Sequence, residues 1–258
     1  MTNSKLLLLC GSGHNGSTIL ARILLAHYAI GGALSETFVF GLTPEQAWLG
    51  VFEQLALQSN SPQWVLEKTP LHLFNAARIL EIFSSASCLF LIRDGRDVVA
   101  SMARRSLSLD SAMQRWSSSA KEILLLRSLF PSRTFLVRYE DLVACPKNTL
   151  SNLSRFLGLK SAPLIHAAQS SADITYLGHQ IDARSAITIY GTHENVNHDI
   201  SHNLRRATQA ALPLSKSGMS RWAELDPDQR KAVMNNDDFL LHEKIYGYLP
   251  WSFRPEMH

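Results

Sequence analysis

Residues 6–20, LLLLCGSGHNGSTIL, determine the architecture of this chain. Four leucines and a cysteine predict a buried strand, and three glycines in the next six residues predict a tight turn before a helix. A glycine-rich turn between a strand and a helix directs backbone N–H groups at one point, where they typically bind phosphate. We therefore expect a phosphate-binding loop that consists of Gly11, Ser12, Gly13, His14, Asn15, Gly16, Ser17 and Thr18.

The loop differs at one position from the loops that bind nucleoside triphosphates. Those loops follow the pattern G-x-x-x-x-G-K-[ST], and here Ser17 occupies the lysine position. Because that lysine normally reaches the transferring phosphate groups, the loop is poorly suited to ordinary nucleoside-triphosphate chemistry.

The composition is that of a globular protein. The 258 residues are 46% hydrophobic and 18% charged, with a formal net charge of +3. This length suits one sizeable α/β domain, so we expect residues 1–258 to form a single domain. The small net charge does not favour binding to nucleic acid, but it is compatible with an anionic small ligand at a local basic cluster.

The cysteines and the apolar segments favour an intracellular protein. The three cysteines, Cys10, Cys88 and Cys145, include no C-x-x-C pair, and their odd number argues against a disulfide framework. The apolar run at 6–10 is too short for a signal-peptide core or a membrane span, and no later run is long enough to span a bilayer. We expect a cytoplasmic protein without a transmembrane segment.

Strand-like and helix-like patterns alternate along the chain, and this alternation predicts a central parallel β-sheet with helices on both faces, a three-layer α/β fold. From about 171 to 220 the periodicity is poor and polar residues dominate, so we expect an irregular excursion or lid there. The expected strands are 6–10, 64–67, 87–92 and 134–137, and the expected helices are 17–27, 44–58, 70–83, 95–105, 111–130, 146–157 and 226–246.

Three further motifs follow expected strands. Lys68 ends the run WVLEK, Arg93 ends the run CLFLIR with Ser101 eight residues later, and Tyr139 begins the sequence YEDL. Because the carboxyl ends of parallel strands meet at one edge of a sheet, where ligands bind, these residues are expected to lie near the glycine-rich loop.

Together the four motifs resemble those of the sulfotransferases that use 3′-phosphoadenosine 5′-phosphosulfate (PAPS), in particular bacterial members related to carbohydrate and protein-tyrosine sulfotransferases. The resemblance implies a P-loop-like fold in which the glycine-rich loop holds the 5′-phosphosulfate, while Arg93 and Ser101 hold the 3′-phosphate. The planar fork of an arginine suits such a phosphate because it donates two parallel hydrogen bonds. The implied product is 3′-phosphoadenosine 5′-phosphate (PAP), and the implied chemistry needs no metal.

The same resemblance implies two catalytic roles. Glu36 lies where related enzymes carry a glutamate that removes the proton of the acceptor hydroxyl, and Lys68 would neutralise the charge on the departing phosphate oxygen. The alternative for Glu36 is a surface glutamate in a turn, and for Lys68 a solvated lysine at a strand end. Tyr139 is expected to pack near the nucleotide.

His14 stands where the family commonly has arginine or lysine. A histidine titrates near pH 6.5 unless its surroundings shift the pKa. We therefore predict that activity falls on the alkaline side as His14 loses its proton. Arg205, in the segment ISHNLRR, resembles a family element that closes over the nucleotide, and its alternative is a solvated basic pair with Arg206.

Two other functions compete with sulfuryl transfer to a hydroxyl or amine. A small-molecule kinase is disfavoured by Ser17 and by Arg93, although Asp94 could bind magnesium. A protein that binds PAPS or PAP without turnover is suggested by His14 but disfavoured by the presence of both Glu36 and Lys68. The resemblance leaves the acceptor open among small molecules, carbohydrates and peptides.

Overall fold

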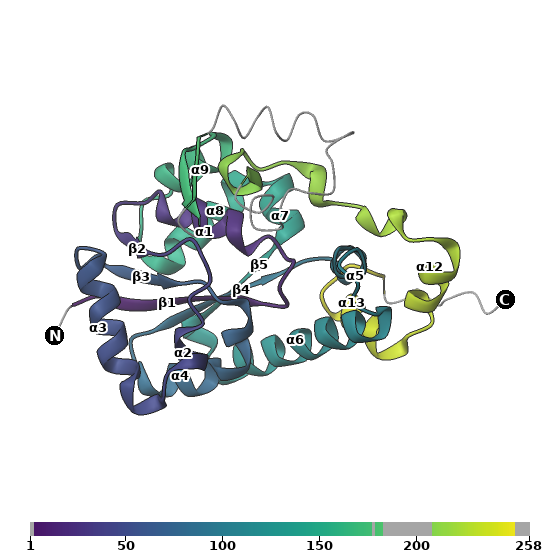
Figure 1. The fold of residues 1–258 in the computed structure, drawn as a ribbon, viewed down its shortest axis with the longest axis horizontal. Coiled ribbons are helices and arrows are strands. Elements are labelled where there is room, and N and C mark those ends of the chain that lie inside the picture. The colour runs from purple at the N-terminus through teal and green to yellow at the C-terminus, as the bar shows by residue number, and fades with distance from the viewer. Residues whose placement is uncertain (1–2, 177–178, 183–207, 251–258) are drawn as a thin grey trace.

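The computed structural model describes residues 3–176, 179–182 and 208–250 (Figure 1). A five-stranded sheet lies at the centre, in the order β2-β3-β1-β4-β5, and every neighbouring pair is parallel. The strands are β1 (Lys5–Gly11), β2 (Ile30–Gly32), β3 (Trp64–Glu67), β4 (Ser87–Ile92) and β5 (Thr134–Arg138). Because all five run in one direction, their carboxyl ends line a single edge of the sheet.

Alternate residues of β1 enter two different cores. Leu6 and Leu8 pack on one face of the sheet, whereas Leu7 and Leu9 pack on the other, and all four are buried. A strand in the middle of a parallel sheet is covered on both faces, which explains its uninterrupted apolar sequence. The predicted three-layer α/β fold is thereby confirmed.

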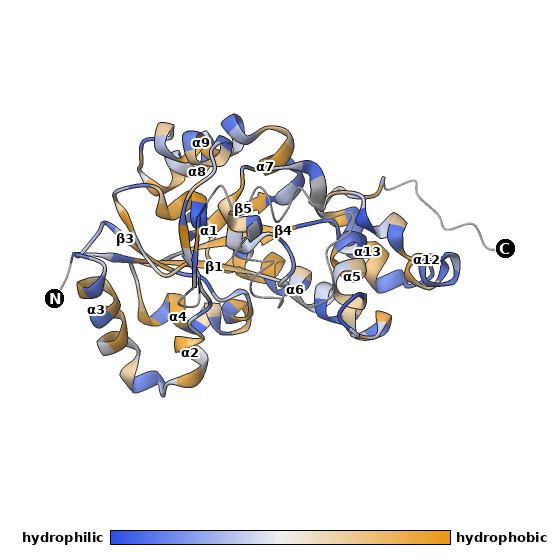
Figure 2. Cartoon of the chain, turned by 45° about the horizontal axis from the view of Figure 1, so that its top comes forward, coloured by the Kyte–Doolittle hydropathy of each residue, from blue (hydrophilic) through white to orange (hydrophobic). Residues whose placement is uncertain are grey.

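Helices cover both faces of the sheet (Figures 1 and 2), and their apolar sides turn inward. The first core includes residues from α2 (Val39–Leu42), α3 (Trp48–Gln58), α4 (Ala76–Ile82), α5 (Gly95–Ala103), α6 (Leu109–Leu129), α12 (Pro227–Met234) and α13 (Asp237–Ile245). The second includes residues from α1 (Ser17–Leu25), α7 (Tyr139–Ala144), α8 (Pro146–Leu157) and α9 (Ala162–Gln169).

The four predicted strands are confirmed to within one residue at either end, but the sequence prediction missed β2. Residues 30–32, interpreted as a break after the first helix, pair with β3 at the edge of the sheet. The predicted helix at 70–83 is a 3₁₀ helix over Pro70–Asn75 followed by α4. The predicted helix at 226–246 is two helices, because Asn236 accepts a hydrogen bond from the Phe239 backbone N–H and starts α13.

The segment at 171–220 is described only in part. An antiparallel pair forms between β6 (Ile174–Tyr176) and β7 (His179–Ile181), so this part of the expected irregular excursion is regular. Short 3₁₀ helices follow over Lys216–Gly218 and Arg221–Glu224. Within the ranges that the structure describes, no helix has the length and apolar character needed to cross a bilayer.

Candidate active site

Every strand of the sheet leads directly into a predicted site residue or loop. The glycine-rich loop follows β1, Lys68 follows β3, and Arg93 follows β4. Tyr139 follows β5, and Glu36 lies in the loop after β2. The predicted residues thus share the edge of the sheet where parallel α/β folds bind their ligands.

A buried asparagine fixes the path of the glycine-rich loop. The Asn15 side chain donates from Nδ2 to the Leu91 carbonyl on β4 over 2.7 Å and accepts the Ser17 backbone N–H through Oδ1 over 3.2 Å. A Cβ atom on Gly11 would lie 2.1 Å from Asn15 Nδ2 and 2.4 Å from the Leu91 carbonyl oxygen. Only glycine therefore fits at position 11. Asn15 ties the loop to the strand that carries Arg93.

Gly16 places the start of α1 against an aromatic ring. Its φ of 91° is left-handed, and a Cβ atom there would come within 2.7 Å of Tyr139 Cδ2. As the N-cap residue, Gly16 has no side chain with which to cap the helix. Asn15 already accepts the N–H of Ser17, the first residue of α1. The next N–H groups of that turn remain for a ligand, and a helix N-terminus favours an anion.

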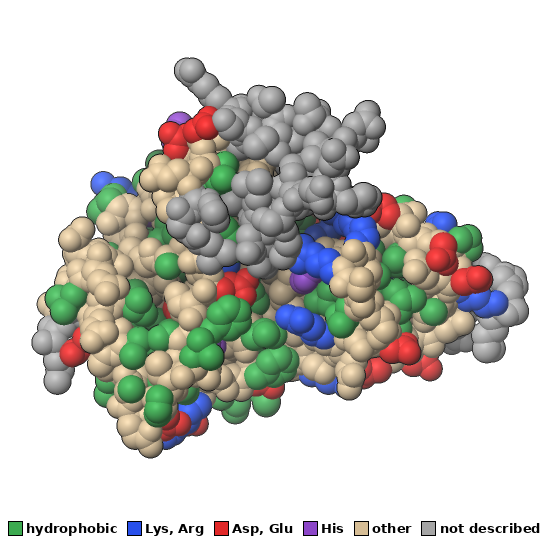
Figure 3. Space-filling view, viewed as in Figure 1, with side chains coloured by type: hydrophobic (Ala, Val, Ile, Leu, Met, Phe, Trp, Pro, Cys, Tyr) green, Lys and Arg blue, Asp and Glu red, His purple; other side chains and the backbone are tan. Residues whose placement is uncertain are grey.

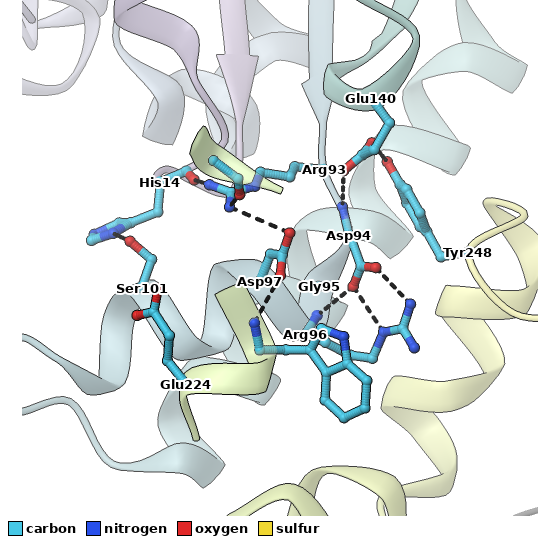
Figure 4. A network of polar contacts seen from close by, with 12 residues as sticks. His14, Arg93, Asp94, Gly95, Arg96, Asp97, Ser101, Glu140, Glu224 and Tyr248 are labelled. Atoms are coloured by element: carbon cyan, nitrogen blue, oxygen red, sulfur yellow. Dashed lines mark hydrogen bonds and ion pairs between the residues drawn. The ribbon is translucent and has the colours of Figure 1, made fainter. Parts of the chain in front are cut away.

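Arg93 meets the glycine-rich loop at the same Tyr139 ring. Its guanidinium carbon lies 5.1 Å from the centroid of the Tyr139 ring, and Nη1 donates to the His14 backbone carbonyl over 3.2 Å (Figure 4). Asp97, one helical turn further on, lies 3.5 Å from Nη2, which also donates to the Gly218 carbonyl. Arg93 is buried, and the loop and the arginine form two walls of one site.

His14 connects the loop to Ser101 (Figure 4). His14 Nδ1 lies 3.1 Å from Ser101 Oγ, and Nε2 lies 3.2 Å from Arg105 Nη1. Because an arginine can only donate, the second contact requires a lone pair on Nε2. These contacts fit a neutral imidazole whose Nδ1–H donates to Ser101 Oγ.

Two arginines near the loop were missed in the sequence. Arg105 contacts the His14 ring, and a Cβ atom on Gly13 would lie 3.3 Å from Arg115 Nη2. Figure 3 shows Lys and Arg side chains gathered beside a histidine on this face of the molecule. Neither arginine belongs to a motif, so nothing in the sequence distinguished them from the other basic residues of the chain.

Glu36 and Lys68 form an ion pair at the ends of β2 and β3. Lys68 Nζ lies 3.6 Å from Glu36 Oε1, and it also lies 5.9 Å from the centroid of the Tyr176 ring. The lysine is fully buried, whereas the Glu36 side chain is 18% exposed. The solvated-lysine alternative is therefore wrong, and the carboxylate has access to an incoming molecule while its partner is enclosed.

A second buried carboxylate lies next to this pair. Glu67 Oε1 accepts hydrogen bonds from the hydroxyls of Thr37 and Thr69 over 2.7 and 2.6 Å, and His72 Nε2 lies 3.6 Å from it. Burial raises the pKa of Glu67 to about 7, although both threonine hydroxyls and Lys68 oppose the rise. Burial also lowers the pKa of His72 to about 4, so the imidazole is neutral near pH 7.

Arg205 lies outside the described residues. The buried Cys10 and Cys88 and the exposed Cys145 are free thiols. Among the residues that the structure describes, no group of three or more histidine, cysteine, aspartate or glutamate side chains could hold a metal ion.

The fold has counterparts among solved sulfotransferases. The sulfotransferase domain of the Synechococcus PCC 7002 olefin synthase aligns with a TM-score of 0.53 and 21% identity, covering 81% of this chain and 94% of that domain. A mouse sulfotransferase complexed with PAP aligns with a TM-score of 0.53 and 10% identity, covering 96% of this chain and 90% of the mouse chain. At these identities the likeness shows the fold alone.

Sequence comparison gives a more specific result. A protein-tyrosine sulfotransferase of Drosophila melanogaster is 31% identical in an alignment 200 residues long, which covers 73% of this chain and 35% of the length of the fly protein. The family model described as the sulfotransferase family matches residues 42–163, a range that contains Lys68, Arg93 and Ser101. With these matches and the shared fold, the chain belongs to the sulfotransferase family.

Proposed function

We propose that this protein transfers a sulfuryl group from PAPS to a hydroxyl acceptor. The observation that carries the proposal is the position of Tyr139, whose ring packs against both Gly16 and Arg93. The two elements expected to bind the two anionic ends of PAPS therefore meet in one site. The mouse relative complexed with PAP supports the same donor.

The donor would be held through its two ends. The first turn of α1 and the backbone of the glycine-rich loop would bind the 5′-phosphosulfate, because their N–H groups converge there. Arg93 and Ser101 would bind the 3′-phosphate, which would displace the Gly218 carbonyl from Arg93. His14 belongs to the loop that would bind the 5′-phosphosulfate and contacts Ser101, which would bind the 3′-phosphate, so it connects the two ends of the donor site.

The Glu36–Lys68 pair would carry out the transfer. The acceptor oxygen attacks the sulfur in line with the bond to the bridging phosphate oxygen, and that bond breaks as the new S–O bond forms. Glu36 accepts the proton of the acceptor hydroxyl. The Lys68 ammonium stabilises the negative charge on the oxygen that leaves with PAP. Positioning and electrostatics supply the catalysis, and no covalent enzyme intermediate is needed.

Exposed apolar side chains lie close in sequence to Glu36 and Lys68. Leu42 of α2 and Phe38, the residue before this helix, are exposed, while Leu71 and Phe74 are exposed and share one face of the next 3₁₀ helix at i, i+3 spacing. The two elements pack together, since the Phe40 backbone N–H donates to His72 Nε2. Figure 3 shows hydrophobic side chains beside the charged groups on this face. We therefore propose an acceptor whose hydroxyl is attached to an aromatic or otherwise apolar group.

The test is turnover of purified protein with PAPS and 4-nitrophenol, with glucose as the polar acceptor and with ATP and magnesium as the alternative donor. The proposal expects PAP and 4-nitrophenyl sulfate as products, and faster turnover with the phenol than with glucose. Consumption of ATP without turnover of PAPS would support the kinase instead. PAP binding without transfer to any acceptor would support the non-catalytic alternative.

A further inference from the structure

Glu67 has no role in the transfer proposed above, yet it is buried at the junction of the two loops that carry the catalytic pair. It is the last residue of β3, directly before Lys68. Its Oε1 atom accepts two hydroxyl hydrogen bonds, one from Thr69 on its own strand end and one from Thr37 in the loop after β2. Thr37 directly follows Glu36. The carboxylate therefore joins the two segments at positions adjacent to the catalytic pair.

The threonine hydroxyls extend this connection to the backbone of the Glu36 loop. Thr69 Oγ1 accepts the backbone N–H groups of Thr37 and Phe38 over 3.2 and 3.1 Å. Thr37 Oγ1 accepts the backbone N–H of Val39 over 3.3 Å. Each hydroxyl has one proton, which it donates to Glu67, and its lone pairs receive the N–H groups. The three consecutive N–H groups thus depend on one carboxylate oxygen.

The loop requires such support because Phe38 has a φ of 55°. A bulky residue in the left-handed region is a real conformational outlier, and the surrounding structure must hold it there. The Phe38 N–H bond to Thr69 is one such restraint. Without it, Phe38 could relax to an ordinary backbone conformation, and Glu36, two residues earlier, would move relative to Lys68.

We propose that Glu67 is a positioning residue of the active site. Together with Thr37 and Thr69 it forms a clamp, here called the Glu67 clamp, that holds the Glu36 carboxylate beside the Lys68 ammonium. This inference rests on the proposed sulfuryl transfer. It assigns to Glu67 no contact with donor or acceptor, since the side chain is enclosed and its second oxygen, Oε2, accepts no hydrogen bond from the described residues.

The groups that face Glu67 give the clamp a pH dependence. Lys68 follows it directly after the end of β3, and His72 approaches from the next 3₁₀ helix. Cys10 lies on the neighbouring β1, and Cys88 on β4 contacts Cys10. Glu36 faces both Lys68 and His72. Because the Glu67 pKa is raised by burial, its charge changes near neutral pH rather than near 4.5. An ionised carboxylate is the stronger acceptor, so the clamp tightens as the pH rises through this range.

The experiment removes the clamp hydroxyls one at a time. Thr37→Val and Thr69→Val keep the side-chain shape and delete the hydroxyl, whereas Thr37→Ser and Thr69→Ser retain it. Thr134→Val is the matched control, because Thr134 is a buried threonine on β5 whose hydroxyl donates to the Phe130 carbonyl. The three readouts are PAPS turnover with 4-nitrophenol, PAP affinity by calorimetry, and hydrogen exchange of the peptide that contains residues 36–42.

The proposal expects both valine variants to lose at least tenfold in kcat while PAP affinity stays within twofold of the wild type. Hydrogen exchange of the backbone N–H groups of residues 37–39 is expected to accelerate in both valine variants. It is expected to stay unchanged in the serine variants and in Thr134→Val. Glu67→Gln is expected to remove the part of the kcat–pH profile that titrates near pH 7. Unchanged kcat in both valine variants would overturn the proposal, as would a loss of PAP affinity in proportion to the loss of kcat.

Failure of the proposed function is separable from failure of the clamp. A wild-type protein that neither binds PAP nor turns over PAPS would refute sulfuryl transfer. Hydrogen exchange needs no turnover, so faster exchange at 37–39 in the valine variants would still establish that the hydroxyls hold the loop. Unchanged exchange would refute the clamp whatever the protein does.

Discussion

Lys68 and Glu36 lie 3.6 Å apart although they belong to loops that follow different strands of the sheet. A fully buried ammonium is tolerated where a carboxylate accompanies it. The exposed side of the carboxylate leaves room for a hydroxyl to approach. The pair thus combines a proton acceptor and a cation at one point.

Removal of either member of the pair is predicted to abolish most of the turnover. Glu36→Gln deletes the proton acceptor and is expected to reduce kcat by about 10²- to 10⁴-fold. Lys68→Met deletes the charge that stabilises the leaving oxygen and is expected to cost about 10²- to 10³-fold. The measurement is kcat with PAPS and 4-nitrophenol. Lys121→Met is the control, because Lys121 pairs with Asp238 at 2.8 Å on the surface, and it is expected to leave kcat unchanged.

Gly16→Ala is predicted to weaken PAP binding and to lower stability. The added methyl group would collide with the Tyr139 ring, and the φ of 91° disfavours any L side chain, so we expect a loss of roughly 1–3 kcal/mol in the free energy of unfolding. Gly50→Ala is the control. Gly50 lies in α3 with no atom within 4 Å of an added Cβ, so this change should stabilise the helix slightly. Equal effects of the two changes on PAP affinity would contradict the assigned role of Gly16.

His14→Arg tests whether the charge on this ring matters. If transfer needs a protonated His14, activity falls on the alkaline side and the permanent charge of an arginine flattens that limb of the pH profile. The contacts with Ser101 and Arg105 fit a neutral ring before the donor binds. The measurement is the pH profile of kcat/KM for the wild type and for His14→Arg, which distinguishes a protonated from a neutral His14 ring during transfer. Identical profiles would show that His14 acts without a charge.

The contributions of Glu67 and His72 to the pH dependence of stability are predicted to cancel where both groups titrate. The folded-state pKa of Glu67 is raised from 4.5 to about 7, so its contribution is present below pH 4.5 and is lost as the pH rises through 7. The folded-state pKa of His72 is lowered from 6.5 to about 4, so its contribution is present above pH 6.5 and is lost as the pH falls through 4. Between pH 4.5 and 6.5 the two slopes oppose each other.

Single substitutions should expose each slope in urea unfolding curves. Relative to the wild type, Glu67→Gln is expected to lose roughly 3 kcal/mol in the free energy of unfolding as the pH falls from 7 to 4.5, because the raised pKa of Glu67 stabilises the folded state at low pH. Relative to the wild type, His72→Gln is expected to lose a similar amount in the free energy of unfolding as the pH rises from 4 to 6.5, because the lowered pKa of His72 stabilises the folded state at the higher pH. If the free energy of unfolding of both variants followed the same pH profile as that of the wild type, neither pKa would be shifted as described.

The sequence was sufficient for four of the five strands in the central sheet and for the glycine-rich loop. Apolar runs such as 6–10 and 87–92 are typical of strands in a covered parallel sheet, and the three close glycines after residues 6–10 predict a tight turn. Residues 30–32 escaped prediction because a three-residue edge strand has too few side chains to show a period. Its pairing with β3 depends on tertiary context.

The contacts within the site were less predictable. Lys68 could be singled out from its place at a strand end, but Glu36 only through the family resemblance. Their ion pair depends on how two separate loops fold over the sheet edge. Asn15 was placed in the phosphate-binding loop, but its side chain instead reaches the Leu91 carbonyl of β4. The hydroxyl contacts of Thr37 and Thr69 likewise join segments that are distant in sequence, and no spacing rule reports such contacts.

The most direct test of the account is calorimetric titration of PAP and ATP into wild-type protein and Arg93→Ala. We predict that the wild type binds PAP more tightly than ATP, and that Arg93→Ala weakens PAP binding by roughly 10- to 100-fold, as expected for loss of a charged hydrogen-bond donor. Arg78→Ala, which removes an exposed arginine paired with Glu45, should bind PAP like the wild type. Equal PAP affinity in wild type and Arg93→Ala would contradict a single site that holds both ends of the donor.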